Sequence, residues 1–160
     1  MTAEDFSSQK IIRTSTITLQ GSRTKVFPLF NPVKEREWAA GWDPQFLTAP
    51  AHDQDITERM VFRTPSHLGH GETEYTWVLS KYAPEQAFIE YTVFTPERLW
   101  WITIQCSDGV PDQTTIAEIT YTYVGLTEKG NAINTLALQQ MYADDLRDWE
   151  RAINHYLMSG

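Results

Sequence analysis

Apolar and polar positions alternate through the middle of the chain, between residues 55 and 124. Five segments rich in β-branched and aromatic residues predict strands there, and groups such as GHG, APE, TPE and SDGVPD predict the turns between them. The segments are ITERMVFRT, ETEYTWVLSKY, QAFIEYTVFT, ERLWWITIQCS and TTIAEITYTYV. Residues 10–21 have the same character and end at Gly21, so they predict a first strand. Regularly spaced short strands of this kind predict an antiparallel meander.

A tight turn at Pro96 and Glu97 would set the register of the two strands beside it. The pairs expected across this turn are Val93 with Trp100, Tyr91 with Ile102, and Ile89 with Ile104. Continued into the next strand, the register pairs Ile104 with Ala117, Ile102 with Ile119, and Trp100 with Tyr121. These residues form an apolar, aromatic face, and the opposite face is mostly polar. Such alternation is typical of an antiparallel sheet with one covered face.

The C-terminal segment predicts a long helix that covers this face. Thr127 predicts an N-cap, and Glu128 suits the positive end of a helix dipole. About 30 residues at 1.5 Å each give roughly 45 Å, enough to cross the sheet. In the first turns Ile133, Leu136 and Ala137 fall on another face, so the helix bends or its first half contacts a different surface. The remaining apolar residues form one stripe at three- and four-residue spacing: Leu138, Tyr142, Leu146, Trp149, Ile153, Tyr156 and Leu157.

Two short helices are predicted between the first strand and the meander. The first is SRTKVFPLFNP, which Pro32 would end, and the second is VKEREWAAG, with Gly41 as its C-terminal cap. Trp38 and Trp42 lie on or just after the second helix. We interpret them as core residues that anchor the helix pair, and a place in the wall of a ligand cavity is the alternative.

Length and charge limit the classes of function. The chain has 160 residues, 41% of them hydrophobic and 21% charged, which predicts one globular domain over residues 1–160. No apolar run is long enough for a membrane span, and the start of the chain lacks the apolar core of a signal peptide. One cysteine, Cys106, fits a reducing cytoplasm, so a cytoplasmic location is expected.

The net charge of -8 argues against nucleic acid and anionic membrane surfaces as partners, because the thirteen basic residues are scattered. A neutral or cationic small molecule, or another protein, remains open as a partner.

The order of the predicted elements resembles the helix-grip fold of the START-like (SRPBCC) superfamily. The phrases that carry the resemblance are VFPLFNPVKEREWAAGWDP, TWVLSKYAPE, ITYTYVGLTEKGN and DWERAINHYL. They are similar to an uncharacterised bacterial branch related to polyketide cyclase-like and Hsp90-activator-like proteins. The resemblance implies an α+β fold, in which a curved antiparallel sheet of about six or seven strands wraps around a long C-terminal helix. Two short helices would close one end of the grip.

The fold also implies a cavity between the sheet and the long helix. A dry core favours Leu, Ile and Val, whereas the predicted lining is aromatic. Buried tyrosine hydroxyls need partners, which suits a ligand or ordered water; the alternative is that they pair with each other, with threonines or with the backbone. The expected ligand-binding residues are Phe62, Tyr75, Trp77, Tyr91, Trp100, Tyr121, Tyr123 and Tyr142.

Candidates for catalysis or metal binding are few. Glu58 shares strand parity with Met60 and Phe62, so it is a weak candidate for an inward general acid, although a solvated place at the rim is the alternative. His67 and His70 form an H-x-x-H pair that needs help from His52, Asp53 or Asp55, so we expect a polar loop rather than a metal site. Cys106 is interpreted as an inert small hydrophobe. Neither a metal nor a cofactor is predicted.

Three function hypotheses follow. The first is binding of a small hydrophobic or aromatic molecule, and the second is a cyclase or aromatase type of enzyme in which Glu58 and the tyrosines move protons. The third is a protein-interaction module like the Hsp90-activator relatives.

An apolar patch is also predicted on the outer, convex face of the sheet. Phe94, Leu99 and Trp101 share this face, and the predicted register sets Leu99 opposite Thr122 and Trp101 opposite Thr120. The patch predicts a homodimer or partner contact, with ordinary scattered exposure as the alternative.

Overall fold

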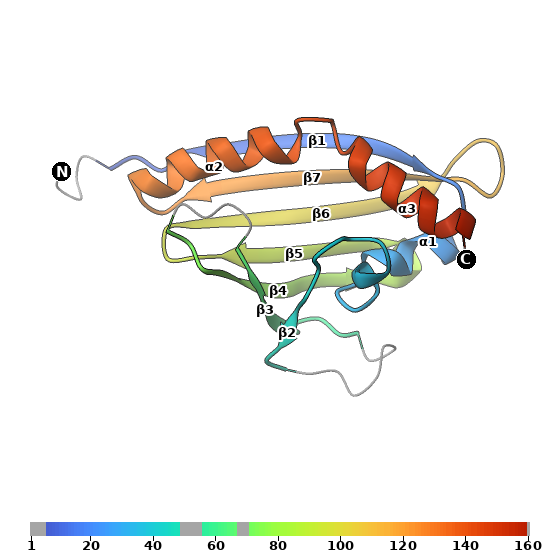
Figure 1. The fold of residues 1–160 in the computed structure, drawn as a ribbon, viewed down its shortest axis with the longest axis horizontal. Coiled ribbons are helices and arrows are strands. Elements are labelled where there is room, and N and C mark those ends of the chain that lie inside the picture. Colours follow the sequence, from blue (N-terminus) through green and yellow to red (C-terminus); the bar gives the residue numbers. More distant parts are fainter. Residues whose placement is uncertain (1–5, 49–55, 67–70, 160) are drawn as a thin grey trace.

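Seven antiparallel strands form one sheet within the described residues, and two helices lie across one of its faces (Figure 1). The computed structural model describes residues 6–48, 56–66 and 71–159. The strands are β1 Lys10–Leu19, β2 Gln45–Phe46, β3 Val61–Pro65, β4 Glu74–Ala83, β5 Phe88–Phe94, β6 Arg98–Asp108 and β7 Thr115–Gly125. Their order in the sheet is β1-β7-β6-β5-β4-β3-β2, so β2 to β7 form a meander and β1 pairs with its last strand. The predicted α+β helix-grip architecture is confirmed; β2 was not predicted.

The predicted register is confirmed between β5 and β6, where Val93 lies opposite Trp100 and Ile89 opposite Ile104. Between β6 and β7 the prediction is wrong by two residues. The loop closes where Gly109 N donates to Thr114 O, later in the chain than expected. A shift of two keeps every side chain on its own face, so the predicted apolar face is preserved. The observed pairs are Ile104 with Ile119, Ile102 with Tyr121, and Trp100 with Tyr123.

Three short helical elements stand where two short helices were predicted. They are α1 Arg23–Val26, η2 Phe27–Phe30 and η3 Lys34–Glu37, of which η2 and η3 are 3-10 helices. Leu29 and Phe30 bury their side chains in the core, so η2 closes one end of the sheet. The helix predicted to reach Gly41 ends instead at Glu37, and an irregular segment follows it.

The single long C-terminal helix predicted from the apolar stripe is two helices, α2 Glu128–Met141 and α3 Arg147–Ser159. Asp145 and Leu146 between them have φ values of 47° and 61°, in the left-handed region that breaks an α-helix. This break lets the two helices contact different strands, since α2 packs mainly on β7 and α3 on β1. Tyr142 anchors the break, because its hydroxyl lies within hydrogen-bond distance of the Arg13 and Ile119 carbonyl oxygens, at 2.9 and 3.1 Å.

The first turn of α2 sits directly on the turn between β5 and β6. Thr127 caps the helix as predicted, because its Oγ1 accepts a hydrogen bond from Gly130 N at 3.0 Å. A Cβ atom at position 130 would lie 1.8 Å from the carbonyl oxygen of Glu97. Only glycine therefore allows the helix to approach this turn so closely.

Replacing Gly130 with alanine is expected to lower the free energy of unfolding by about 1–3 kcal/mol, the usual cost of overpacking. Alanine is the better helix former, so the same change would stabilise a solvent-facing helix position. Urea unfolding of Gly130→Ala beside Gln139→Ala, an exposed control in the same helix, measures the difference. A Gly130→Ala protein as stable as the control would contradict the close contact.

Candidate functional site

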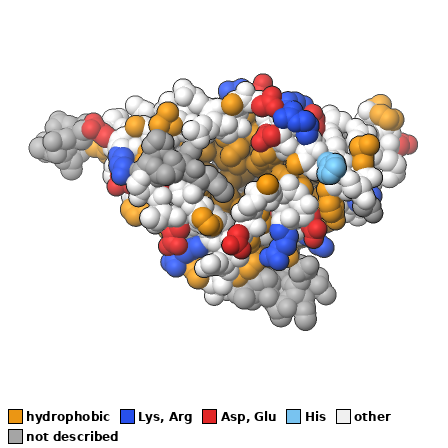
Figure 2. All heavy atoms as spheres, viewed as in Figure 1, with side chains coloured by type: hydrophobic (Ala, Val, Ile, Leu, Met, Phe, Trp, Pro, Cys, Tyr) orange, Lys and Arg blue, Asp and Glu red, His pale blue; other side chains and the backbone are white. Residues whose placement is uncertain are grey.

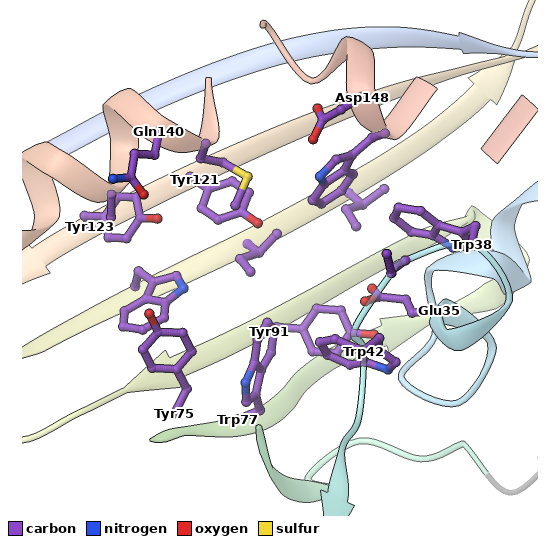
Figure 3. Close-up of a pocket in the computed structure, with 18 of the residues that line it drawn as sticks. Glu35, Trp38, Trp42, Tyr75, Trp77, Tyr91, Tyr121, Tyr123, Gln140 and Asp148 are labelled. Carbon is purple, nitrogen blue, oxygen red and sulfur yellow. The ribbon is translucent and has the colours of Figure 1, made fainter. Parts of the chain in front are cut away.

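A cavity of about 320 Å³ lies between the apolar face of the sheet, helices α2 and α3, and the segment that follows η3. Figure 2 shows it as a hollow floored by hydrophobic side chains, and Figure 3 shows its walls. Gln140 and Asp148 are exposed residues at its rim. The lining comprises Glu35, Trp38, Ala39, Ala40, Trp42, Tyr75, Trp77, Tyr91, Arg98, Trp100, Ile102, Ile104, Tyr121, Tyr123, Ala137, Gln140, Met141, Asp148 and Trp149.

Several lining aromatics use their polar atoms to bind the protein itself. The indole Nε1 atoms of Trp38 and Trp42 donate to the carbonyl oxygens of Leu29 and Pro32, both at 2.7 Å. The hydroxyl of Tyr91 donates to the Phe30 carbonyl oxygen at 2.6 Å. These bonds hold the rings on the backbone of residues 29–32, in and just after η2. The rings thereby present mainly carbon surface to the cavity.

Ring-to-ring contacts hold the two sides of the cavity in place. Trp42 meets Trp77 edge to face, with 5.2 Å between the ring centroids. On the helix side, Trp38 and Trp149 are 5.4 Å apart. Such pairs add stability beyond their buried area. Trp38 and Trp42 are therefore both packed against the core and part of the cavity wall, so the two alternatives for them hold together.

Glu35 places a carboxyl group in this aromatic wall. Glu35 is 9% exposed. Figure 3 shows its side chain turned from η3 toward the space between the sheet and the helices. No hydrogen bond or ion pair joins this carboxyl to any residue in the described part of the chain. Burial raises the pKa of Glu35 well above its ordinary value of 4.5. Burial therefore makes the protonated form of Glu35 more favourable than in an exposed glutamate.

Burial also raises the pKa values of the tyrosines near Glu35, so their hydroxyls stay protonated at neutral pH. Burial raises the pKa of Tyr121, and the neighbouring Tyr123, Tyr142, Glu35 and Asp148 raise it further. Burial, followed by the Glu35 charge, raises the pKa of Tyr91. Within the described residues, the hydroxyl of Tyr121 has no hydrogen-bond partner. Glu35 and Tyr121 are thus two polar groups that the protein leaves available to a ligand.

Arg98 lies at the other end of the cavity and is already paired. Its Nε and Nη2 donate to the two carboxylate oxygens of Glu72, both at 2.9 Å, and both side chains are almost fully buried. Nη1 donates to Asn134 Oδ1 at 3.2 Å. The guanidinium carbon also stands 4.1 Å from the centre of the Trp100 ring. A bidentate pair with a stacked aromatic ring satisfies a buried guanidinium.

Solved structures share this architecture. Norcoclaurine synthase from Thalictrum flavum, in a structure with dopamine and hydroxybenzaldehyde, superposes with a TM-score of 0.69 at 10% identity, over 96% of this chain and 89% of that one. An uncharacterised protein from Rhizobium leguminosarum superposes with a TM-score of 0.60 at 15% identity, over 93% of this chain and 97% of that one. The di-domain ARO/CYC BexL of the BE-7585A biosynthetic pathway superposes with a TM-score of 0.63 at 12% identity, over 92% of this chain and 46% of that one.

The chain has the helix-grip fold. The resemblance to START-like proteins is confirmed as a resemblance of fold. No family model matches the chain, and the search of curated proteins finds no match.

Six of the eight predicted ligand-binding residues line the cavity of this helix-grip fold, and two do not. Phe62 is fully buried behind the wall, where its ring stacks on Trp77 at 5.5 Å. Tyr142, at the helix break, donates its hydroxyl toward the backbone carbonyls of Arg13 in β1 and Ile119 in β7, so it supports the cavity from outside. The six that line it are Tyr75, Trp77, Tyr91, Trp100, Tyr121 and Tyr123.

The inward placement considered for Glu58 is wrong. The strand begins only at Val61, and Glu58 lies in an exposed turn beside Arg59, whose φ is 72°. Strand parity therefore does not apply to it. Its Oε1 accepts a hydrogen bond from Tyr82 N at 3.0 Å, and it is not part of the cavity lining.

Glu35 and Arg98 were missed, although the sequence holds a signal for each. Arg98 shares the parity of Trp100 and Ile102, which placed it on the inner face. Glu35 precedes Trp38 by three residues and Trp42 by seven, a spacing that puts all three on one side of a helical segment. The cavity residues of α2 and α3 take their positions from the break between the two helices. No local sequence motif predicted this break.

The other candidate groups form no site in the described part of the chain. Cys106 is buried, and burial raises the pKa of its thiol to about 12, so it stays protonated as expected for a small hydrophobe. Among the described residues, no group of three or more His, Cys, Asp or Glu side chains could hold a metal ion. The H-x-x-H pair and its proposed helpers, His67, His70, His52, Asp53 and Asp55, lie outside the described residues.

Replacing Glu35 with glutamine is expected to stabilise the ligand-free protein at neutral pH. Because burial raises the pKa of Glu35, the folded state keeps this proton at pH values where the unfolded chain has lost it. The wild-type protein then loses about 1.4 kcal/mol per pH unit as the pH rises from about 4.5 to the folded pKa. Glutamine has no proton to lose.

Urea unfolding of both proteins across this pH range tests the expectation. The stability gain of Glu35→Gln should be smallest in acid and should grow as the pH rises. Glu37→Gln, an exposed glutamate of the same 3-10 helix, is the control and should show no such growth. A gain that is independent of pH would show that Glu35 ionises as freely as an exposed glutamate.

Proposed function

We propose that this protein binds a small aromatic molecule in the cavity between its sheet and helices α2 and α3. The observation that carries the proposal is an open space of about 320 Å³ walled mainly by aromatic rings. Ligand sites of this kind combine apolar walls with a few polar groups, and this volume is near the lower end of their range. A molecule of one or two rings suits it.

Structures that share the fold support the same class of ligand. The norcoclaurine synthase structure holds dopamine and hydroxybenzaldehyde, both small aromatic molecules, and BexL is an ARO/CYC protein. At 10% and 12% identity these likenesses concern the fold, so the argument for this chain rests on its own cavity. A cavity packed shut by its aromatic residues would have favoured the interaction-module hypothesis. The open cavity argues against it.

A second candidate is an enzyme of the cyclase or aromatase type. Glu35 supports it, because a buried carboxyl with a raised pKa can hold a proton at neutral pH and deliver it to a bound molecule. The Tyr121 hydroxyl, which lines the same cavity, is a further donor. In this reading Glu35 takes the role first considered for Glu58.

The outer face offers a separate contact surface. Phe94 is 41% exposed, while Leu99 and Trp101 are half-buried. Phe94 pairs with Leu99 across β5 and β6, and the β7 partners of Leu99 and Trp101 are Val124 and Thr122 rather than the predicted Thr122 and Thr120. The patch is thus more apolar than expected. A homodimer through it stays a prediction, which the mass of the protein in solution tests.

Filling the cavity is expected to abolish aromatic binding. Ala137 lines the cavity from α2, whereas Ala132 lies on the exposed side of the same helix. Isothermal titration calorimetry with the neutral probe 2-naphthol should show saturable binding to the wild-type protein. Ala137→Phe should weaken this binding at least about tenfold, equivalent to about 1.4 kcal/mol. The control Ala132→Phe should bind like the wild type.

Two results would count against the proposal. One is the absence of saturable 2-naphthol binding to the wild-type protein. The other is unchanged affinity in Ala137→Phe, which would place the bound probe elsewhere. Circular dichroism spectra of both variants check that the fold is retained.

A further inference from the structure

On the basis of the proposed function, we infer that the aromatic ligand carries a protonated amine and that the Glu35 carboxylate is its counter-ion. The inference names the chemical class of the ligand and assigns one residue the task of selecting it. It follows from the charges of the cavity and from the partners each charge already has.

The first argument is the unpaired state of Glu35. Buried carboxyl groups in proteins are normally paired or hydrogen-bonded, because burying an unsatisfied polar group costs free energy. Glu35 is nine-tenths buried in the cavity wall and has no such partner among the described residues. A ligand cation that enters the cavity supplies the missing partner. It also reverses the effect of burial, since an opposite charge nearby favours the ionised carboxyl.

The second argument concerns the positive charge available to an anionic ligand. Arg98 is the one basic side chain of the described cavity lining. Its guanidinium already binds both oxygens of Glu72 and the amide of Asn134, and its face covers Trp100. An anionic ligand would have to break this buried pair, which is costly. The net charge of -8 and the acidic Asp148 at the rim also disfavour an anion.

The third argument is the aromatic surface on both sides of Glu35. Trp38 follows it by three residues and packs against Trp149 of α3, while Tyr91 and Tyr121 line the sheet side. Figure 3 shows the Glu35 carboxyl between Trp38 and Tyr91. The faces of Trp and Tyr rings attract cations, most strongly where water is excluded. A carboxylate with aromatic neighbours on two sides suits an ammonium group better than a neutral hydroxyl.

Three probes of one shape and different charge test the inference. They are 2-naphthylmethylamine, which is cationic at neutral pH, 2-naphthylmethanol, which is neutral, and 2-naphthoate, which is anionic. Titration calorimetry with the wild-type protein should give an affinity for the amine at least about tenfold higher than for the alcohol. The anion should bind most weakly.

Two variants assign the preference to one residue. Glu35→Gln should lower the affinity for the amine at least about tenfold while leaving the affinity for the alcohol close to that of the wild type. Glu37→Gln removes the same charge from the exposed side of η3 and should keep the preference. Circular dichroism and thermal unfolding confirm that both variants are folded.

The outcomes separate this inference from the proposed function. If the wild-type protein binds the alcohol as tightly as the amine, the charge selection is overturned, and aromatic binding stands. The same holds if Glu35→Gln keeps the full preference for the amine. If none of the three probes binds, the proposed function fails and the inference fails with it. The comparison of amine and alcohol on the wild-type protein decides the inference even if Glu35→Gln does not fold.

Discussion

The whole structure depends on covering one apolar face of a curved antiparallel sheet. Alternation along β4 to β7 places large aromatic and aliphatic side chains on that face, and burying them is the main driving force available to a chain of this size. Helices α2 and α3 and the η2 segment supply the cover. The helices contact the sheet mainly on β7 and β1, and the η2 segment closes one end of it. A cavity remains because the cover is anchored around it.

Two buried ionisable groups of the cavity, Arg98 and Glu35, respond to desolvation in opposite ways. Arg98 is neutralised inside the protein by Glu72, and this pair fixes the end of the sheet where β6 begins. Glu35 has no hydrogen-bond or ion-pair partner among the residues that the structure describes, so the free-energy cost of its burial is not offset there. A structural role would have favoured an apolar residue at this position. This contrast is the reason to expect that the partner of Glu35 is a bound ligand rather than another residue of the protein.

The sequence predicted the fold well and the site partly, for physical reasons. Period-two alternation survives a register error of two residues, so the inner face and six lining aromatics were found although the β6–β7 pairing was misjudged. The apolar stripe at helical spacing predicted one helix, because left-handed residues such as Asp145 and Leu146 carry no local mark. Glu58 was considered for the inner face because strand parity was applied to a turn, and its exposed position agrees with the solvated alternative. Glu35 was overlooked because charged residues in a short helical segment are ordinarily solvated.

The hydrogen bonds that hold the cavity wall do not depend on the small residues that also line the cavity. Trp38, Trp42 and Tyr91 are fastened to main-chain carbonyls of residues 29–32, and any side chain at those positions leaves these carbonyls in place. Ala39, Ala40 and Ala137 also face the space, and their methyl groups carry no hydrogen bond. Ligand preference can therefore change through these small residues while the frame stays intact. A scaffold of this design can diversify in evolution, or be redesigned in the laboratory, one lining position at a time.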